Sequence, residues 1–143
     1  MYTPPQARAT NAYRRVGVET SVQNASPHRL VHLLYQELLQ CLNTARGAMA
    51  RNDVPAKGAA ITKAVRILDE GLKSALNPEQ GGDVARNLGM LYDYCIRRLT
   101  LANVRNDDAA LAEVRSLIEP VAQAWSDIGE NAAAAARSQK TGV

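Results

Sequence analysis

The fold is decided by the stretch "SPHRLVHLLYQELLQCLNTARGAM", residues 26–49. Ser26 can cap a helix through its hydroxyl, and Pro27 suits the first helical position because its missing N–H would have no partner there. Apolar residues then recur at steps of three and four in two adjacent rows: Leu30, Leu34, Leu38, Cys41, Ala45 and Ala48, beside Val31, Tyr35, Leu42 and Met49. This spacing predicts one long amphipathic helix that ends near Arg51.

The same pattern predicts a second helix, which Asp53 opens as a cap and which runs to Leu76. The sequence "NPEQGG" at 77–82 opposes continuation, so we expect Asp83 to open a third helix. The residues that this third helix turns inward are expected to be Val84, Leu88, Leu91, Tyr92, Cys95, Leu99 and Ala102.

A fourth helix follows the turn "NVRNDD", with Asp107 or Asp108 as its cap. Its expected inward row is Leu111, Val114, Ile118, Val121, Trp125 and Ile128. No strand-like alternation appears, and the connections between helices are short, so consecutive helices should be antiparallel neighbours. The sequence therefore predicts an all-α fold, an antiparallel up-down-up-down four-helix bundle over residues 26–130.

The two ends of the chain lack such a pattern. Residues 1–25 show no sustained helical period, and Pro4 and Pro5 are expected to stop any early helix. Scattered apolar residues in this segment nevertheless predict that it packs on the bundle as an N-terminal cap. Residues 131–143 are predicted to be a flexible C-terminal tail.

Composition narrows the class of protein. A chain of 143 residues suggests one domain. The net charge is +3, but no run of basic residues exceeds two, which argues against nucleic acid as a partner. No apolar run is long enough to span a membrane and no signal peptide is visible, so we expect a cytoplasmic protein without membrane insertion. Cys41 and Cys95 lie on inward rows and are expected to be reduced, buried thiols.

No arrangement of residues points to catalysis. His28 and His32 stand four residues apart, a spacing that can chelate zinc, but no third ligand is evident and the glutamate of a zinc-protease motif is missing. Nucleophile elbows, phosphate-binding glycine loops and di-metal motifs are also missing. The sequence therefore predicts neither an enzyme nor a metal or cofactor site.

The stretch "NLGMLYDYCIRRLTLAN", residues 87–103, carries more apolar residues than one inner face needs. Met90, Tyr94, Ile96 and Leu101 are left beside or outside that face. They form either the edge of a wide bundle seam or a groove for a partner helix. Two classes of function stay open on this pattern: a binding module, and a structural or regulatory bundle that associates with itself.

Four motifs follow one another along the chain: "AYRRVGVETSVQNASP" (12–27), "LLY" (33–35), "DVPAKGAAITKAVRILDEGL" (53–72) and "EQGGDVARNLGMLYDYCIRRLTLAN" (79–103). With these motifs in this order, the chain from Tyr13 to Trp125 resembles the FliS family of flagellar secretion chaperones. The sequence departs from the family at residues 36–37, where Asp-Gly is frequent, at Cys95, where Met is common, and at residues 77–78.

This resemblance implies a chaperone that binds the disordered C-terminal region of flagellin in the cytoplasm. It further implies that the chaperone prevents premature polymerisation, hands the client to the flagellar type III export apparatus, and uses no cofactor. Other flagellar regulators would be additional partners. The resemblance, together with the surplus of apolar residues in 87–103, predicts the residues of a client-binding groove or cap. They are Tyr13, Val16, Leu34, Tyr35, Met90, Leu91, Tyr94, Ile96 and Leu101.

Overall fold

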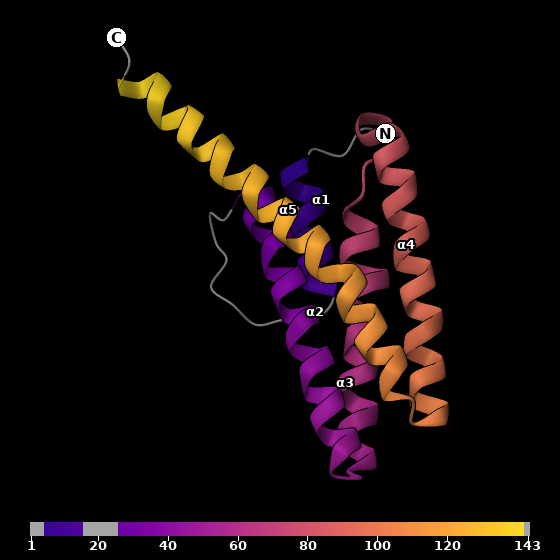
Figure 1. Ribbon diagram of the computed structural model, residues 1–143. Coiled ribbons are helices and arrows are strands. Elements are labelled where there is room, and N and C mark those ends of the chain that lie inside the picture. Colours follow the sequence, from indigo (N-terminus) through magenta and orange to yellow (C-terminus); the bar gives the residue numbers. More distant parts are fainter. Residues whose placement is uncertain (1–4, 16–25, 142–143) are drawn as a thin grey trace.

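The computed structural model describes residues 5–15 and 26–141 of the chain, with side chains described for 8–14 and 26–130 (Figure 1). The elements are α1 (Pro5–Arg15), α2 (Pro27–Ala50), α3 (Val54–Arg66), the π-helical segment η1 (Ile67–Lys73), α4 (Pro78–Arg105) and α5 (Asp108–Thr141). These residues contain no strand. The predicted all-α class is therefore confirmed.

Three of the predicted helix starts are confirmed by their caps. The side-chain oxygens of Ser26, Asp53 and Asp107 accept hydrogen bonds from backbone N–H groups two or three residues further along the chain. Each cap therefore satisfies donors that the first turn leaves without an intrahelical partner. The end of α2 at Ala50 also agrees with the predicted end near Arg51.

The expected start of the third helix at Asp83 is corrected. Asn77 is the cap, and its side-chain oxygen accepts hydrogen bonds from the N–H groups of Glu79 and Gln80. The helical turn that begins at Pro78 is interrupted at Gly82, whose backbone angles are φ 52° and ψ −126°. Glycine tolerates this left-handed φ because it has no Cβ. Asp83 therefore opens only the uninterrupted remainder of α4.

The expectation that Pro4 and Pro5 stop any early helix is wrong. Pro5 is itself the first residue of α1, a position that a proline tolerates. Ala9, Ala12 and Tyr13 follow at helical spacing and are all buried. α1 packs against α2 and η1. The parts of the predicted cap at 1–4 and 16–25, Val16 included, lie outside the described residues.

The remaining helices enclose one core. α3 packs against α2 and α4, while α5 packs against α2 and α4. The largest fully buried side chains are Tyr35, Tyr92, Leu30, Leu34, Leu38, Leu42, Ile67, Leu68, Leu72, Leu99, Leu111 and Ile118. These contacts are compatible with a four-helix bundle, and both the bundle arrangement and its antiparallel order stay predictions.

Two tyrosines meet in the middle of this core. The hydroxyl oxygens of Tyr35 on α2 and Tyr92 on α4 lie 2.5 Å apart, and both side chains are buried. Burial raises the pKa of both hydroxyls. The pair supplies each buried hydroxyl with a partner, without which its burial would destabilise the fold.

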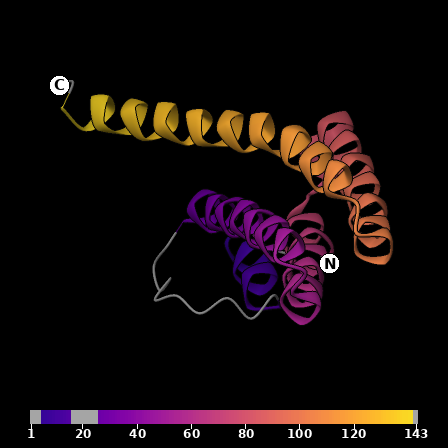
Figure 2. The ribbon, with the colours of Figure 1, turned by 60° about the horizontal axis from the view of Figure 1, so that its bottom comes forward.

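Several residues of the predicted inward rows lie elsewhere. Val84 is 67% exposed and Ile128 is 59% exposed, so both inward assignments are wrong. Val84 lies two residues after the interruption at Gly82. Ile128 belongs to the second half of α5, a helix whose C-terminal part extends away from the other helices (Figure 2). The backbone of α5 is helical as far as Thr141, so that the segment predicted as a tail continues the helix.

Both cysteines are buried as predicted, and we expect them to react slowly. Burial raises the pKa of the Cys41 and Cys95 thiols to about 11. Because only the thiolate is nucleophilic, an aromatic disulfide reagent at pH 8 should label the native protein at least ~100-fold more slowly than the denatured chain. Absorbance of the released thiol measures both rates. Equal rates with and without denaturant would contradict the burial of these residues.

Candidate functional site

The structure divides the residues predicted for a client site into two groups. Tyr13, Leu34 and Tyr35 are buried, with exposed fractions of 3%, 0% and 2%. Leu34 and Tyr35 belong to the core of the folded chain, and Tyr13 anchors α1 to it. These three side chains are therefore not available at the surface while α1 is in place.

A second group lies on the outer face of α4. Met90 is 69% exposed, and Tyr94 and Leu101 are partly exposed. Arg97 and Val104 continue the same face, Val104 with 77% of its surface exposed. We call these five residues the α4 outer stripe. Their steps of four, three, four and three residues place them within one narrow sector of the helix.

The other two predicted residues of α4 lie beside the stripe. Leu91 and Ile96 are partly buried and pack against the core cluster. They contribute more to the stability of the bundle than to its outer surface. The structure thus brings Met90, Tyr94 and Leu101 together on one face, with Leu91 and Ile96 on opposite flanks of it, toward the core.

Tyr94 is held in place by a clamp between α4 and α5. Its hydroxyl donates to Glu113 Oε2 at 2.7 Å, and Arg98 Nε donates to Glu113 Oε1 at 2.6 Å. These two hydrogen bonds lower the pKa of Glu113, and the hydroxyl bond raises the pKa of Tyr94. The guanidinium carbon of Arg97 lies 5.9 Å from the centroid of the Tyr94 ring. The phenol oxygen is therefore engaged while the ring remains partly exposed.

Sequence reasoning missed Arg97, Val104 and Glu113. The helical spacing of Arg97 and Val104 from Met90 could have placed the first two on the stripe. No sequence signal could have identified Glu113, because its partners Tyr94 and Arg98 lie on another helix.

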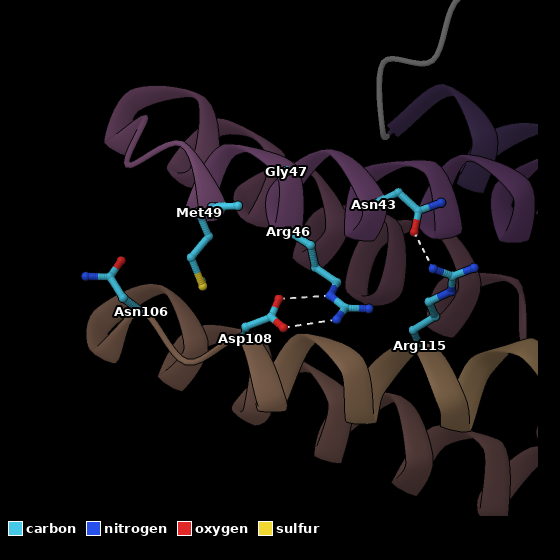
Figure 3. A pocket seen from close by; sticks show the side chains of 8 residues that line it. Asn43, Arg46, Gly47, Met49, Asn106, Asp108 and Arg115 are labelled. Atoms are coloured by element: carbon cyan, nitrogen blue, oxygen red, sulfur yellow. Dashed lines mark hydrogen bonds and ion pairs between the residues drawn. The ribbon is translucent and has the colours of Figure 1, made fainter.

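Among the hollows along the contact of α2 with α5, two differ in what lines them. One, of about 660 Å³, contains the ion pair between Arg46 and Asp108, whose Nε and Oδ1 atoms lie 2.8 Å apart (Figure 3). In the same hollow Arg115 donates to the side-chain oxygen of Asn43 at 2.7 Å. The other, of about 570 Å³, reaches Tyr35. In the first, the described basic side chains already have partners, so we do not assign it an anion.

The start of α2 is fastened to α5 by His28 and Trp125. Their rings are stacked with centroids 4.6 Å apart and an interplanar angle of 4°. His28 Nε2 lies 2.6 Å from the Trp125 carbonyl oxygen, and Trp125 Nε1 donates to the His28 carbonyl at 3.0 Å. Gly129 faces the His28 ring so closely that a Cβ there would collide with it.

Trp125, expected on the inner row, is only partly buried, and its removal should be correspondingly less destabilising than that of a core residue. We expect Trp125→Ala to lower the free energy of unfolding by about 2 kcal/mol, from lost apolar burial and one lost hydrogen bond. Trp125→Phe keeps a stacked ring and should lose about 1 kcal/mol. Denaturant melts measure both, and an unchanged midpoint for Trp125→Ala would contradict the fastening role.

The described residues offer no reactive centre. Among them no three histidine, cysteine, aspartate or glutamate side chains are arranged to hold a metal ion. No helix within the described ranges combines the length and apolar character that crossing a membrane requires. The α4 outer stripe can supply apolar contact, an aromatic face and one cation, which suits recognition of another chain.

The chain is similar to proteins of one family. Residues 9–132 match the family described as Flagellar protein FliS. The flagellar secretion chaperone FliS of Salmonella typhimurium is 46% identical over 132 residues, covering 92% of this chain and 96% of that protein. FliSB of Pseudomonas aeruginosa is 46% identical over 121 residues, covering 85% and 95%. FliS of Bacillus subtilis is 34% identical over 107 residues, covering 75% and 78%.

Proposed function

The chain belongs to the FliS family of flagellar proteins, and from this premise we propose that its client is the disordered C-terminal region of a flagellin. As a family of chaperones, FliS is not a family of enzymes, and the chain is a flagellar secretion chaperone. In this proposal it binds the client in the cytoplasm and prevents premature polymerisation. It then delivers the client to the flagellar type III export apparatus.

The exposed apolar surface of α4 is the observation that supports client binding most directly. The α4 outer stripe runs from Met90 to Val104, a length of about 21 Å at 1.5 Å per residue. This length matches about four turns of a client helix laid against it. A disordered segment loses conformational entropy when it orders on a surface, and burial of apolar side chains offsets that loss.

The scaffold for this surface is, in our proposal, an antiparallel four-helix bundle made by α2, α3 with η1, α4 and α5. The Tyr94–Glu113–Arg98 clamp fixes α5 against α4 on the stripe side. A rigid scaffold reduces the ordering that binding requires of the chaperone itself. The client then carries most of the conformational change.

Titration of the protein with the C-terminal segment of a flagellin tests the proposal. We expect a one-to-one complex with micromolar or tighter affinity by calorimetry, and a gain of helical signal in circular dichroism as the segment orders. A segment of the same composition in scrambled order is the control. If the cognate segment does not bind at micromolar concentrations, the client assignment fails.

The alternative, a structural bundle that associates with itself, makes a different prediction. Its apolar stripe would be covered by a second copy, and sedimentation would show a mass that rises with protein concentration without any client. A monomer that binds the flagellin segment supports the chaperone assignment. A stable dimer that does not bind the segment would favour the alternative.

We propose that α1 is a cap that competes with the client. Its own residues Ala9, Ala12 and Tyr13 are buried against the rest of the chain, so the departure of α1 would expose apolar surface near α2 and η1. In this proposal the client also contacts the surface of α2 and η1 that α1 covers, in addition to the α4 outer stripe. Removal of residues 1–12 should therefore speed client association, because a site that α1 occupies part of the time becomes permanently open. Stopped-flow association of a labelled segment measures this rate.

Tyr13→Ala is the companion to this truncation, since it loosens α1 without deleting it. We expect an intermediate association rate and increased binding of an apolar dye. If both variants fold normally and associate at the parent rate, α1 is a permanent part of the structure and not a competing cap.

A further inference from the structure

A small cavity lies where α1, α2, α5 and the connection from η1 to α4 converge. Its volume is about 160 Å³, and its walls include Val31, Ala75 and Trp125 together with Arg8. It is distinct from the α4 outer stripe, none of whose residues line it. At about 30 Å³ per water, the space suits a ligand of roughly five or six non-hydrogen atoms.

Arg8 brings an incompletely partnered cation to this cavity. Its Nη1 donates to the carbonyl oxygen of Leu76 at 3.0 Å. Its Nε is buried and has no hydrogen-bond partner. Within the described residues no carboxylate lies in ion-pair contact with Arg8. A guanidinium at a cavity wall without a carboxylate partner favours an anion in that cavity, which would accept from its terminal N–H groups because Nε itself is enclosed by protein. A carboxylate is the acceptor that the guanidinium geometry suits best.

The surroundings of Arg8 favour the same class of ligand. Pro27 and His28, from the first turn of α2, border the cavity, and this end of a helix carries partial positive charge. Ala9, Val31, Ala75 and Trp125 add apolar walls, and Asn77 and Gln80 add polar ones. The cavity therefore combines attraction for an anion with space for a short hydrocarbon group.

We propose that this cavity binds a short aliphatic carboxylate, whose oxygens accept from the Arg8 guanidinium while its alkyl group contacts Val31, Ala75 and Trp125. The carboxylate belongs either to a free small acid or to the C-terminal residue of a peptide. Both sources present the same chemistry to Arg8, and the experiment below separates them.

Such a ligand touches α1 together with α2 and α5, so it stabilises α1 in its docked position. A ligand that binds only the docked form shifts the equilibrium toward that form. The ligand therefore lowers the affinity of the protein for any partner that binds only when α1 is displaced. By linkage, such a partner lowers the affinity for the ligand by the same factor. This consequence, unlike binding itself, rests on the proposed role of α1 as a cap.

Trp125 provides the readout, because it is the single tryptophan of the chain and forms a wall of the cavity. Titration with 2-methylpropanoate should produce a saturable change in its fluorescence, with a dissociation constant on the order of millimolar for a ligand of this size. The neutral 2-methylpropanamide has the same shape without the charge and should bind at least tenfold more weakly. A tetrapeptide ending in valine, and its C-terminal amide, form the second pair of probes.

Arg8→Gln should weaken the carboxylates at least tenfold and leave the amides unchanged. Arg14→Gln, at an exposed position of the same helix, is the matched control and should behave as the parent does. Ala75→Leu fills the cavity while keeping Arg8, so it should abolish binding of every probe. Circular dichroism verifies that each variant is folded.

Saturable binding of either carboxylate that depends on Arg8 supports the proposal. If 2-methylpropanoate binds more tightly, the ligand is a free small acid, and if the tetrapeptide binds more tightly, it is the C-terminus of a peptide. Equal binding of acid and amide, or binding that survives both Arg8→Gln and Ala75→Leu, would overturn it. So would the absence of a saturable response to either acid up to about 50 mM, which is an order of magnitude above the expected constant. None of these outcomes depends on whether the protein binds flagellin.

Discussion

Tyr92→Ala is expected to lower the free energy of unfolding by about 4–8 kcal/mol. The truncation removes a fully buried aromatic ring, which costs about 3–5 kcal/mol through lost apolar transfer and the cavity left behind. It also leaves the buried hydroxyl of Tyr35 without its partner, which adds about 1–3 kcal/mol. Since small domains have about 5–15 kcal/mol of stability, this variant should be close to unfolding at room temperature. Urea denaturation followed by circular dichroism measures the change.

A cycle of phenylalanine substitutions isolates the hydroxyl pair without emptying the core. Tyr35→Phe and Tyr92→Phe should each cost about 1–3 kcal/mol, whereas the double variant should be close to the parent. Because burial raises the pKa of both tyrosines, the pair stabilises the fold fully below about pH 10 and loses this effect as the pH rises further. Additive single effects in the cycle would show that the two hydroxyls are not coupled.

Met90→Asp combined with Leu101→Asp is expected to reduce affinity for the flagellin C-terminal segment at least 100-fold, or about 2.7 kcal/mol. Both side chains lie on the α4 outer stripe, and an apolar client helix would have to desolvate two carboxylates to bind there. Stability should change little, because Met90 is exposed and Leu101 lies outside the core cluster. Calorimetry gives the affinity, and a denaturant melt gives the stability.

Val84→Asp is the matched control for this double variant. Val84 is as exposed as Met90 and belongs to the same helix, but at 100° per residue it points about 120° away from the stripe. It should leave the affinity within about twofold of the parent, a change too small to be read as a lost contact. Unchanged binding by the double variant would move the client to another surface, whereas equal losses in both would point to a general effect of charge.

Local signals made most of the helices predictable from sequence. Helix starts are predictable at Ser26, Asp53 and Asp107, because a cap depends only on residues that are adjacent in the sequence. The capping side chain accepts a hydrogen bond from a backbone N–H within the next three residues. The helix of residues 5–15 was not predictable in this way. Among its described side chains the buried ones are Ala9, Ala12 and Tyr13, and three residues are too few to establish a helical period.

The candidate site was less predictable, because burial depends on which of two neighbouring apolar rows faces the core. Leu34 and Tyr35 were assigned to a groove but lie within the core, since α2 is covered by α3 on one flank and α5 on the other. Met90 and Leu101 do lie outside, as the surplus of apolar residues indicated. Arg8 and its cavity had no signal in the sequence, because segments far apart along the chain assemble it.

The π-helical segment Ile67–Lys73 changes the direction around the helix axis in which the following side chains point. Ala60, Ala64, Leu68 and Leu72 follow one another at steps of four residues and are all buried. In an α-helix each such step advances the side chain by about 40°, so a continuous α-helix would turn this row away from the core. The wider π turn, with more residues per turn, rotates the row back. An insertion or deletion of one residue in this segment therefore changes the length of the helix little. It rotates every later side chain about the helix axis by about 100°.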